Sequence, residues 1–145
     1  MKIKFKEQQF QLDAVKSVVD CFRGQPKKTS QFQLDNGQYQ EAAEAQMTLW
    51  PETGFNNSPI KISEQDVLNN IREVQARNGL KLSDKLAGKY NLTIEMETGT
   101  GKTYTYIRTM FELYKAYGWN KYIIVVPSIA IREGVYKSFQ MTEEH

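Results

Sequence analysis

The sequence has 145 residues, of which 40% are hydrophobic and 25% are charged, and its formal net charge at pH 7 is +2. That length allows one packed domain, and the composition is typical of an ordinary globular protein without a membrane-spanning run. The small net charge excludes the overall basic character that announces nucleic-acid binding, so any DNA path has to be local.

Histidine and cysteine usage restricts the chemistry further. The only histidine is His145, which excludes histidine-based catalytic triads and multi-histidine metal sites. The lone Cys21 cannot form an internal disulfide, and the basic N-terminus lacks the apolar core of a secretion signal. We therefore expect a reducing, cytoplasmic setting and no membrane.

The first elements in the chain are an edge strand and a helix. Residues 2–6 alternate between polar and apolar side chains, as a short edge strand does. From about Gln8, apolar residues recur at helical spacing until Gly24-Gln25-Pro26 ends the helix. The apolar residues of this helix are Leu12, Val15, Val18, Val19 and Phe22.

The helical periodicity of apolar residues is lost over residues 25–62 and returns at Ser63. Residues 25–62 are rich in Gln and Asn, and we interpret them as an inserted loop that could hold a short helix near Glu41–Met47. Ser63 can cap a helix that ends by Gly79. Residues 25–90 as a whole form a polar insert or loop-rich region, and a partner-facing surface is the alternative.

A strand at Leu92–Met96 is predicted to run into a phosphate-binding turn. Gly99 and Gly101 let the backbone pass close to phosphates, and the start of the next helix adds the attraction of its N–H groups. Lys102 would reach the β- and γ-phosphates, and the hydroxyl of Thr103 would ligate Mg²⁺.

This motif departs from the general phosphate-loop pattern, because Met96 holds the position of the first glycine. The alternative interpretation is an ordinary glycine turn with a surface lysine. The run Thr98-Gly99-Thr100-Gly101-Lys102-Thr103 resembles instead the first motif of superfamily 2 helicases and translocases, where the leading position is commonly not glycine.

The rest of the chain predicts an α/β fold. A helix that stops at Gly118 is followed by Tyr122–Val126, a β-branched run typical of a central parallel strand. Ser128 can cap a further helix. Strand, helix, strand and helix in this order predict a doubly wound parallel sheet with its ligand at the C-terminal strand ends. The apolar stripes of the two helices are Tyr104, Ile107, Phe111, Tyr114 and Tyr117, and then Ile129, Ile131, Val135 and Phe139.

Together, the segments Ile94–Tyr104 and Tyr122–Val135 resemble the N-terminal motor region of the Res subunit of type III restriction enzymes. Phe10–Val15 is similar to the family's glutamine motif, and Phe111–Tyr114 also agrees. The resemblance implies a P-loop NTPase (RecA-like) fold that uses ATP and Mg²⁺. It also implies an ATP-dependent DNA translocase and endonuclease, acting on double-stranded DNA with a methyltransferase (Mod) subunit.

The resemblance assigns three further residues. Gln11 would contact the adenine edge, with Gln8 and Gln9 as competing candidates and a solvated glutamine as the alternative. Ser128 and Arg132 would contact the DNA backbone, and the alternative is a helix cap and a surface arginine.

One part of the family's pattern is missing. Hydrolysis needs an acidic pair at the end of a third strand, yet no aspartate follows Thr103. We therefore expect an incomplete first motor lobe, an N-terminal part whose remainder is absent, that binds ATP without turning it over. The alternatives are another superfamily 2 helicase, a small-molecule kinase, or a nucleotide- or partner-binding fragment without activity of its own.

Overall fold

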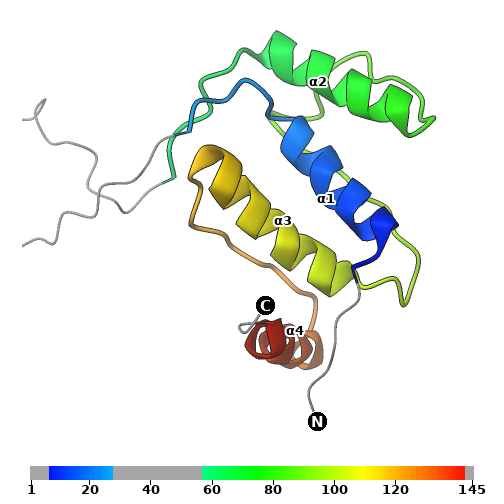
Figure 1. The fold of residues 1–145 in the computed structure, drawn as a ribbon, viewed down its shortest axis with the longest axis vertical. Helices are drawn as coiled ribbons and strands as arrows, with labels where there is room; N and C mark the ends of the chain where they lie inside the picture. Colours follow the sequence, from blue (N-terminus) through cyan, green and yellow to red (C-terminus); the bar gives the residue numbers. More distant parts are fainter. Residues whose placement is uncertain (1–6, 28–56, 143–145) are drawn as a thin grey trace, which may run out of the picture.

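The computed structural model describes residues 7–27 and 57–142. Within these residues the chain forms four helices and no strand: α1 (Gln9–Asp20), α2 (Glu64–Arg77), α3 (Lys102–Tyr117) and α4 (Ile129–Thr142). Figure 1 shows α1 between α2 and α3, and α4 packs against α3. None of the described helices is long and apolar enough to cross a membrane.

The predicted doubly wound sheet is therefore wrong for the described part of the chain. Both predicted strands, Leu92–Met96 and Tyr122–Val126, have no regular secondary structure in the described residues. In the second segment Ile123 is 94% exposed and Val125 is 88% exposed. A strand needs a neighbour for its N–H and C=O groups, and a stable sheet generally needs at least three strands. β-Branched composition alone does not supply these neighbours.

The helix ends follow the local sequence. Ser63 caps α2 as predicted, because its Oγ accepts a hydrogen bond from the Asp66 N–H at 3.1 Å. The α2 helix ends at Arg77, before Gly79, and α3 ends at Tyr117, before Gly118, so both predicted ends are confirmed. The predicted elements at residues 2–6 and Glu41–Met47 lie outside the described residues.

The main core joins the C-terminal ends of α1 and α3. The Phe22 and Trp119 rings pack edge to face with their centroids 5.1 Å apart. The centroids of the Tyr117 and Trp119 rings are 5.3 Å apart. The Tyr117 hydroxyl donates to the Val19 carbonyl at 2.8 Å, which satisfies a polar group inside this apolar cluster. The buried members are Cys21, Phe22, Leu113, Tyr117 and Trp119.

The predicted core stripe of α3 is only partly correct. Ile107 and Tyr117 are buried, but Phe111 is 55% exposed and Tyr114 is 52% exposed. The buried face of α3 is shifted to Thr105, Ile107, Thr109, Leu113 and Tyr117. Burying Thr109 is possible because its hydroxyl donates to the Thr105 carbonyl at 2.8 Å.

A short segment, residues 57–62, fastens the end of α1 to the end of α3. The Asn57 side chain accepts hydrogen bonds from the backbone of Asn120 and Lys121, and the Trp119 indole donates to the Ser58 carbonyl at 3.0 Å. Buried Gln25 donates to the Pro59 carbonyl at 3.0 Å. The two flanks of the predicted insert are thus held beside the aromatic core.

After α3 ends, residues 118–128 run back along α3 to α4 (Figure 1). The Tyr122 hydroxyl lies 3.0 Å from the Met110 carbonyl and 2.8 Å from the Trp119 carbonyl. Burial of this hydroxyl raises the pKa of Tyr122 to about 12. Tyr122 is therefore fixed to α3 as a neutral phenol, while Ile123 and Val125 point to solvent.

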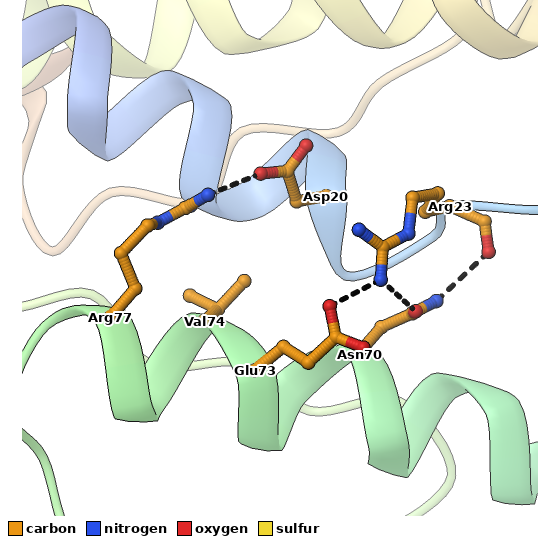
Figure 2. A pocket seen from close by; sticks show the side chains of 6 residues that line it. All are labelled: Asp20, Arg23, Asn70, Glu73, Val74 and Arg77. Carbon is orange, nitrogen blue, oxygen red and sulfur yellow. Dashed lines mark hydrogen bonds and ion pairs between the residues drawn. The ribbon is translucent and has the colours of Figure 1, made fainter.

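A polar cluster that sequence reasoning missed joins α1 to α2 around a cavity of about 140 Å³ (Figure 2). Arg77 pairs with Asp20 at 2.7 Å, and Arg23 pairs with Glu73. Between them, buried Asn70 donates to the carbonyls of Arg23 at 2.9 Å and Cys21 at 3.3 Å. The two arginines and two carboxylates balance in charge, which indicates a structural clamp between the helices.

The Cys21 thiol lies at this clamp. Burial and the nearby Asp20 carboxylate raise the pKa of Cys21 to about 11, with Arg77 opposing them. The thiol donates to the Ser17 carbonyl at 3.2 Å. At neutral pH Cys21 therefore behaves as a small buried apolar side chain.

Replacing Asn70 with alanine should lower the free energy of unfolding by about 1–3 kcal/mol, because two carbonyls lose their donor in a buried setting. Asn69→Ala is the matched control, since Asn69 is exposed on the same helix and its side chain accepts a hydrogen bond from Gln65 at 3.1 Å. Urea melts of both variants measure the difference. Equal stabilities of the two variants would contradict the clamp.

Candidate functional site

The predicted phosphate loop connects residues 92–96 to the start of α3. Gly99 has φ of +80° and Gly101 has φ of +84°, in the left-handed region that favours glycine. A Cβ on Gly101 would also lie only 2.5 Å from Nε2 of Gln11, whereas one on Gly99 would meet nothing within 4 Å. Glycine is thus favoured at position 99 by its positive φ alone. At position 101 it is favoured both by its positive φ and by the lack of room for a Cβ.

Lys102 folds back over its own loop. Its exposed ammonium donates to the carbonyls of Met96 at 2.8 Å and Glu97 at 2.7 Å. The Thr100 hydroxyl donates to the same Glu97 carbonyl at 2.6 Å, and Thr98 is exposed beside it. A phosphate entering the loop would compete with these carbonyls for the lysine.

The start of α3 carries groups that suit an anion. Gly101 provides no side-chain cap, and the first turn contains no acidic residue. The free N–H groups of a helix start and its positive dipole end favour a phosphate. Thr103, half-buried in this turn, adds a hydroxyl of the kind that ligates Mg²⁺ in phosphate loops. The residues present therefore fit a magnesium-bound polyphosphate.

Gln11 is placed against this loop from α1. Its Nε2 donates to the Thr100 carbonyl at 2.8 Å, across a sequence separation of 89 residues. The competing glutamines lie elsewhere: Gln9 contacts Asp13 at 2.9 Å, and Gln8 precedes α1 without capping it. The structure thus brings Gln11, out of these candidates, to the loop.

Ser128 and Arg132 lie at the start of α4. The Ser128 hydroxyl accepts a hydrogen bond from the Ile131 N–H at 3.3 Å, which is a capping contact. The side chain of Arg132 is 67% exposed and pairs with neighbouring Glu133 at 3.0 Å. Neither contact involves the phosphate loop.

A largely apolar cleft of about 830 Å³ lies between α1, α2 and the segment after α2, and Glu97 and Thr100 are among the residues that line it. Exposed Phe10, Leu80 and Ile94 line it. Sequence analysis did not predict this cleft, because the segments that enclose it are distant in sequence.

A family model described as type III restriction enzyme, res subunit, matches residues 57–145, which include the whole predicted phosphate loop. The chain belongs to this Res subunit family. The resemblance noted at Ile94–Tyr104 and Tyr122–Val135 is therefore confirmed.

Curated relatives carry the same subunit name. The chain is 52% identical over 80 residues to the EcoP15I Res subunit of Escherichia coli, and the match covers 54% of this chain and 8% of the relative. It is 42% identical over 80 residues to the EcoPI Res subunit of Escherichia phage P1, with the same coverage of 54% and 8%. It is 49% identical over 53 residues to the StyLTI Res subunit of Salmonella typhimurium, covering 37% of this chain and 5% of the relative. The chain thus spans only a small part of the length of these Res subunits.

Proposed function

We propose that this chain contributes the ATP-binding loop of a Res subunit that works as an ATP-dependent DNA translocase and endonuclease. The loop geometry carries the proposal: two left-handed glycines, an exposed lysine folded over the loop, and an uncapped helix start lie together. The residues proposed to bind ATP are Gln11, Thr98, Gly99, Thr100, Gly101, Lys102 and Thr103, and the hydroxyl of Thr103 would ligate Mg²⁺.

The family supports the partners in this proposal. Res subunits belong to type III restriction-modification systems, so we propose double-stranded DNA as substrate and a methyltransferase (Mod) subunit as partner. The buried free Cys21 accords with our assignment of the chain to the reducing cytoplasm.

Mg-ATP should raise the melting temperature of the 145-residue chain. At about a hundred times its Kd, a ligand that binds only the folded state stabilises it by about 2.7 kcal/mol. Thermal melts with Mg-ATP, compared with magnesium alone, measure this shift. A folded chain whose melting temperature does not respond to Mg-ATP would contradict the proposed function.

We also propose that Arg132 and Ser128 contact the DNA backbone. The single positive charge of Arg132 lies exposed at a helix start, which fits one phosphate contact. Arg132→Ala should weaken DNA binding equally for all sequences and lower the log–log salt slope by about one unit. Arg132→Lys keeps the charge and should keep the slope. Fluorescence anisotropy at several salt concentrations tests both variants, and an unchanged slope in Arg132→Ala would assign Arg132 to the surface alone.

A further inference from the structure

The segment between α2 and residues 92–96 concentrates positive charge. Residues 78–91, the basic segment, contain Lys81, Lys85 and Lys89 against the single carboxylate of Asp84. This stretch alone therefore carries a net charge of +2, which equals the net charge of the whole chain. All three lysines are exposed, and none of them forms an ion pair with a residue that the structure describes. Their charge is thus available to a ligand in solution.

Hydrogen bonds to α2 fix the middle of the basic segment. The side-chain amide of Gln75 donates to the Ser83 hydroxyl at 2.8 Å, and its oxygen accepts from the Ser83 N–H at 2.8 Å. The Arg72 guanidinium donates to the carbonyls of Ser83 at 2.8 Å and Asp84 at 3.1 Å. The backbone that carries the lysines is therefore held against α2 before any ligand binds, which lowers the entropy lost on binding.

A turn presents the last of the three lysines. The Asn91 N–H donates to the Ala87 carbonyl at 3.1 Å, and Gly88 has φ of +58°. A Cβ on Gly88 would lie only 2.6 Å from Nδ2 of Asn91, so both conformation and space favour glycine there. Lys89 follows this glycine within the turn and is exposed.

Three unpaired ammonium groups on a fixed backbone suit a ligand with closely repeated negative charges. Lysine is depleted at protein–protein interfaces, whereas it commonly contacts phosphates in protein–DNA complexes. Duplex DNA carries one negative charge per about 1.7 Å of its axis, so neighbouring lysines can each meet a phosphate.

We infer that the basic segment is a second contact region for the phosphate backbone of double-stranded DNA, separate from Arg132. The segment is held against α2, whereas Arg132 belongs to α4, and Figure 1 shows α2 and α4 on opposite sides of the α1–α3 pair. Lysine contacts to phosphates fix the position of the duplex without reading its sequence. This inference rests on the proposed function, because it takes DNA as the substrate.

The test replaces the three lysines of the basic segment together with glutamine in the 145-residue chain. The control variant replaces three other exposed lysines with glutamine, so both variants lose the same net charge: Lys16, Lys27 and Lys61. Fluorescence anisotropy with a labelled duplex of arbitrary sequence, without nucleotide, gives the affinity at several salt concentrations. The segment variant should lower the log–log salt slope by about two to three units, at about 0.9 for each lost phosphate contact, and the control by less than about one unit.

The single variant Lys89→Gln should lower the slope by about one unit. An unchanged slope in the segment variant, or an equal loss in the control variant, would overturn the inference. Lost affinity for polyglutamate with an unchanged DNA slope would assign the lysines to an acidic protein partner and overturn it too. If Arg132→Ala lowers the slope but the segment variant does not, this inference fails while the DNA contact in the proposed function stands. A wild-type chain that does not bind the duplex would overturn both.

Discussion

Replacing Lys102 with alanine is expected to remove the Mg-ATP-dependent rise in melting temperature while leaving the ligand-free melting temperature nearly unchanged. The Lys102 ammonium is exposed and donates to the loop carbonyls of Met96 and Glu97, so its loss should alter stability by no more than about 0.5 kcal/mol. In the complex it would contact two phosphates, and each charged hydrogen bond is worth about 1.5–3 kcal/mol. Affinity should therefore fall by about 100-fold or more.

Lys115→Ala is the matched control for this prediction. Lys115 lies on the same helix, 63% exposed, and pairs with Glu112 at 2.9 Å, far along the helix from the loop. Thermal melts of wild type and both variants over a range of Mg-ATP concentrations give the comparison. An undiminished shift in Lys102→Ala, or an equal loss in Lys115→Ala, would remove the support for Lys102 as a phosphate ligand.

Replacing Trp119 with alanine should have the largest effect on stability, about 3–5 kcal/mol. The indole is 8% exposed, packs against Phe22 and Tyr117, and donates to the Ser58 carbonyl. Its removal leaves a cavity in the cluster that joins α1 to α3 and frees residues 57–62. At about 2–4 °C per kcal/mol, the melting temperature should fall by roughly 6–20 °C.

Two further variants help to explain the loss of stability in Trp119→Ala: one isolates the hydrogen bond, and the other is a control at an exposed aromatic residue. Trp119→Phe keeps most of the ring and loses the hydrogen bond to Ser58, so a share of about 1 kcal/mol is expected from that bond. Tyr114→Ala removes a 52% exposed aromatic side chain from α3 and should stay within about 0.5 kcal/mol of wild type. Chemical denaturation of all three variants checks the order. If the Trp119→Ala variant were as stable as the Tyr114→Ala variant, the aromatic cluster would not be the core.

Local signals in the sequence determined where the helices begin and end. Ser63 caps α2 through the N–H of Asp66, and α3 lies between Gly101 and Gly118, as the sequence predicts. Gly99 and Gly101 adopt the positive φ that a phosphate-binding turn requires. Such features depend on interactions within about four residues, which is why a single sequence contains them. The motif residues were also enough to predict the family, because they are contiguous in the sequence.

Contacts between residues distant in sequence decided the other features of the fold. The runs Leu92–Met96 and Tyr122–Val126 have strand composition, but pairing depends on neighbours that the described residues do not place beside them. Which face of α3 is buried depended on the approach of α1, and this left Tyr114 outside. The contact of Gln11 with Thr100 joins residues 89 positions apart. Helical periodicity repeats every few residues and cannot encode such a separation, so the contact between Gln11 and the predicted phosphate loop became visible only in the tertiary structure.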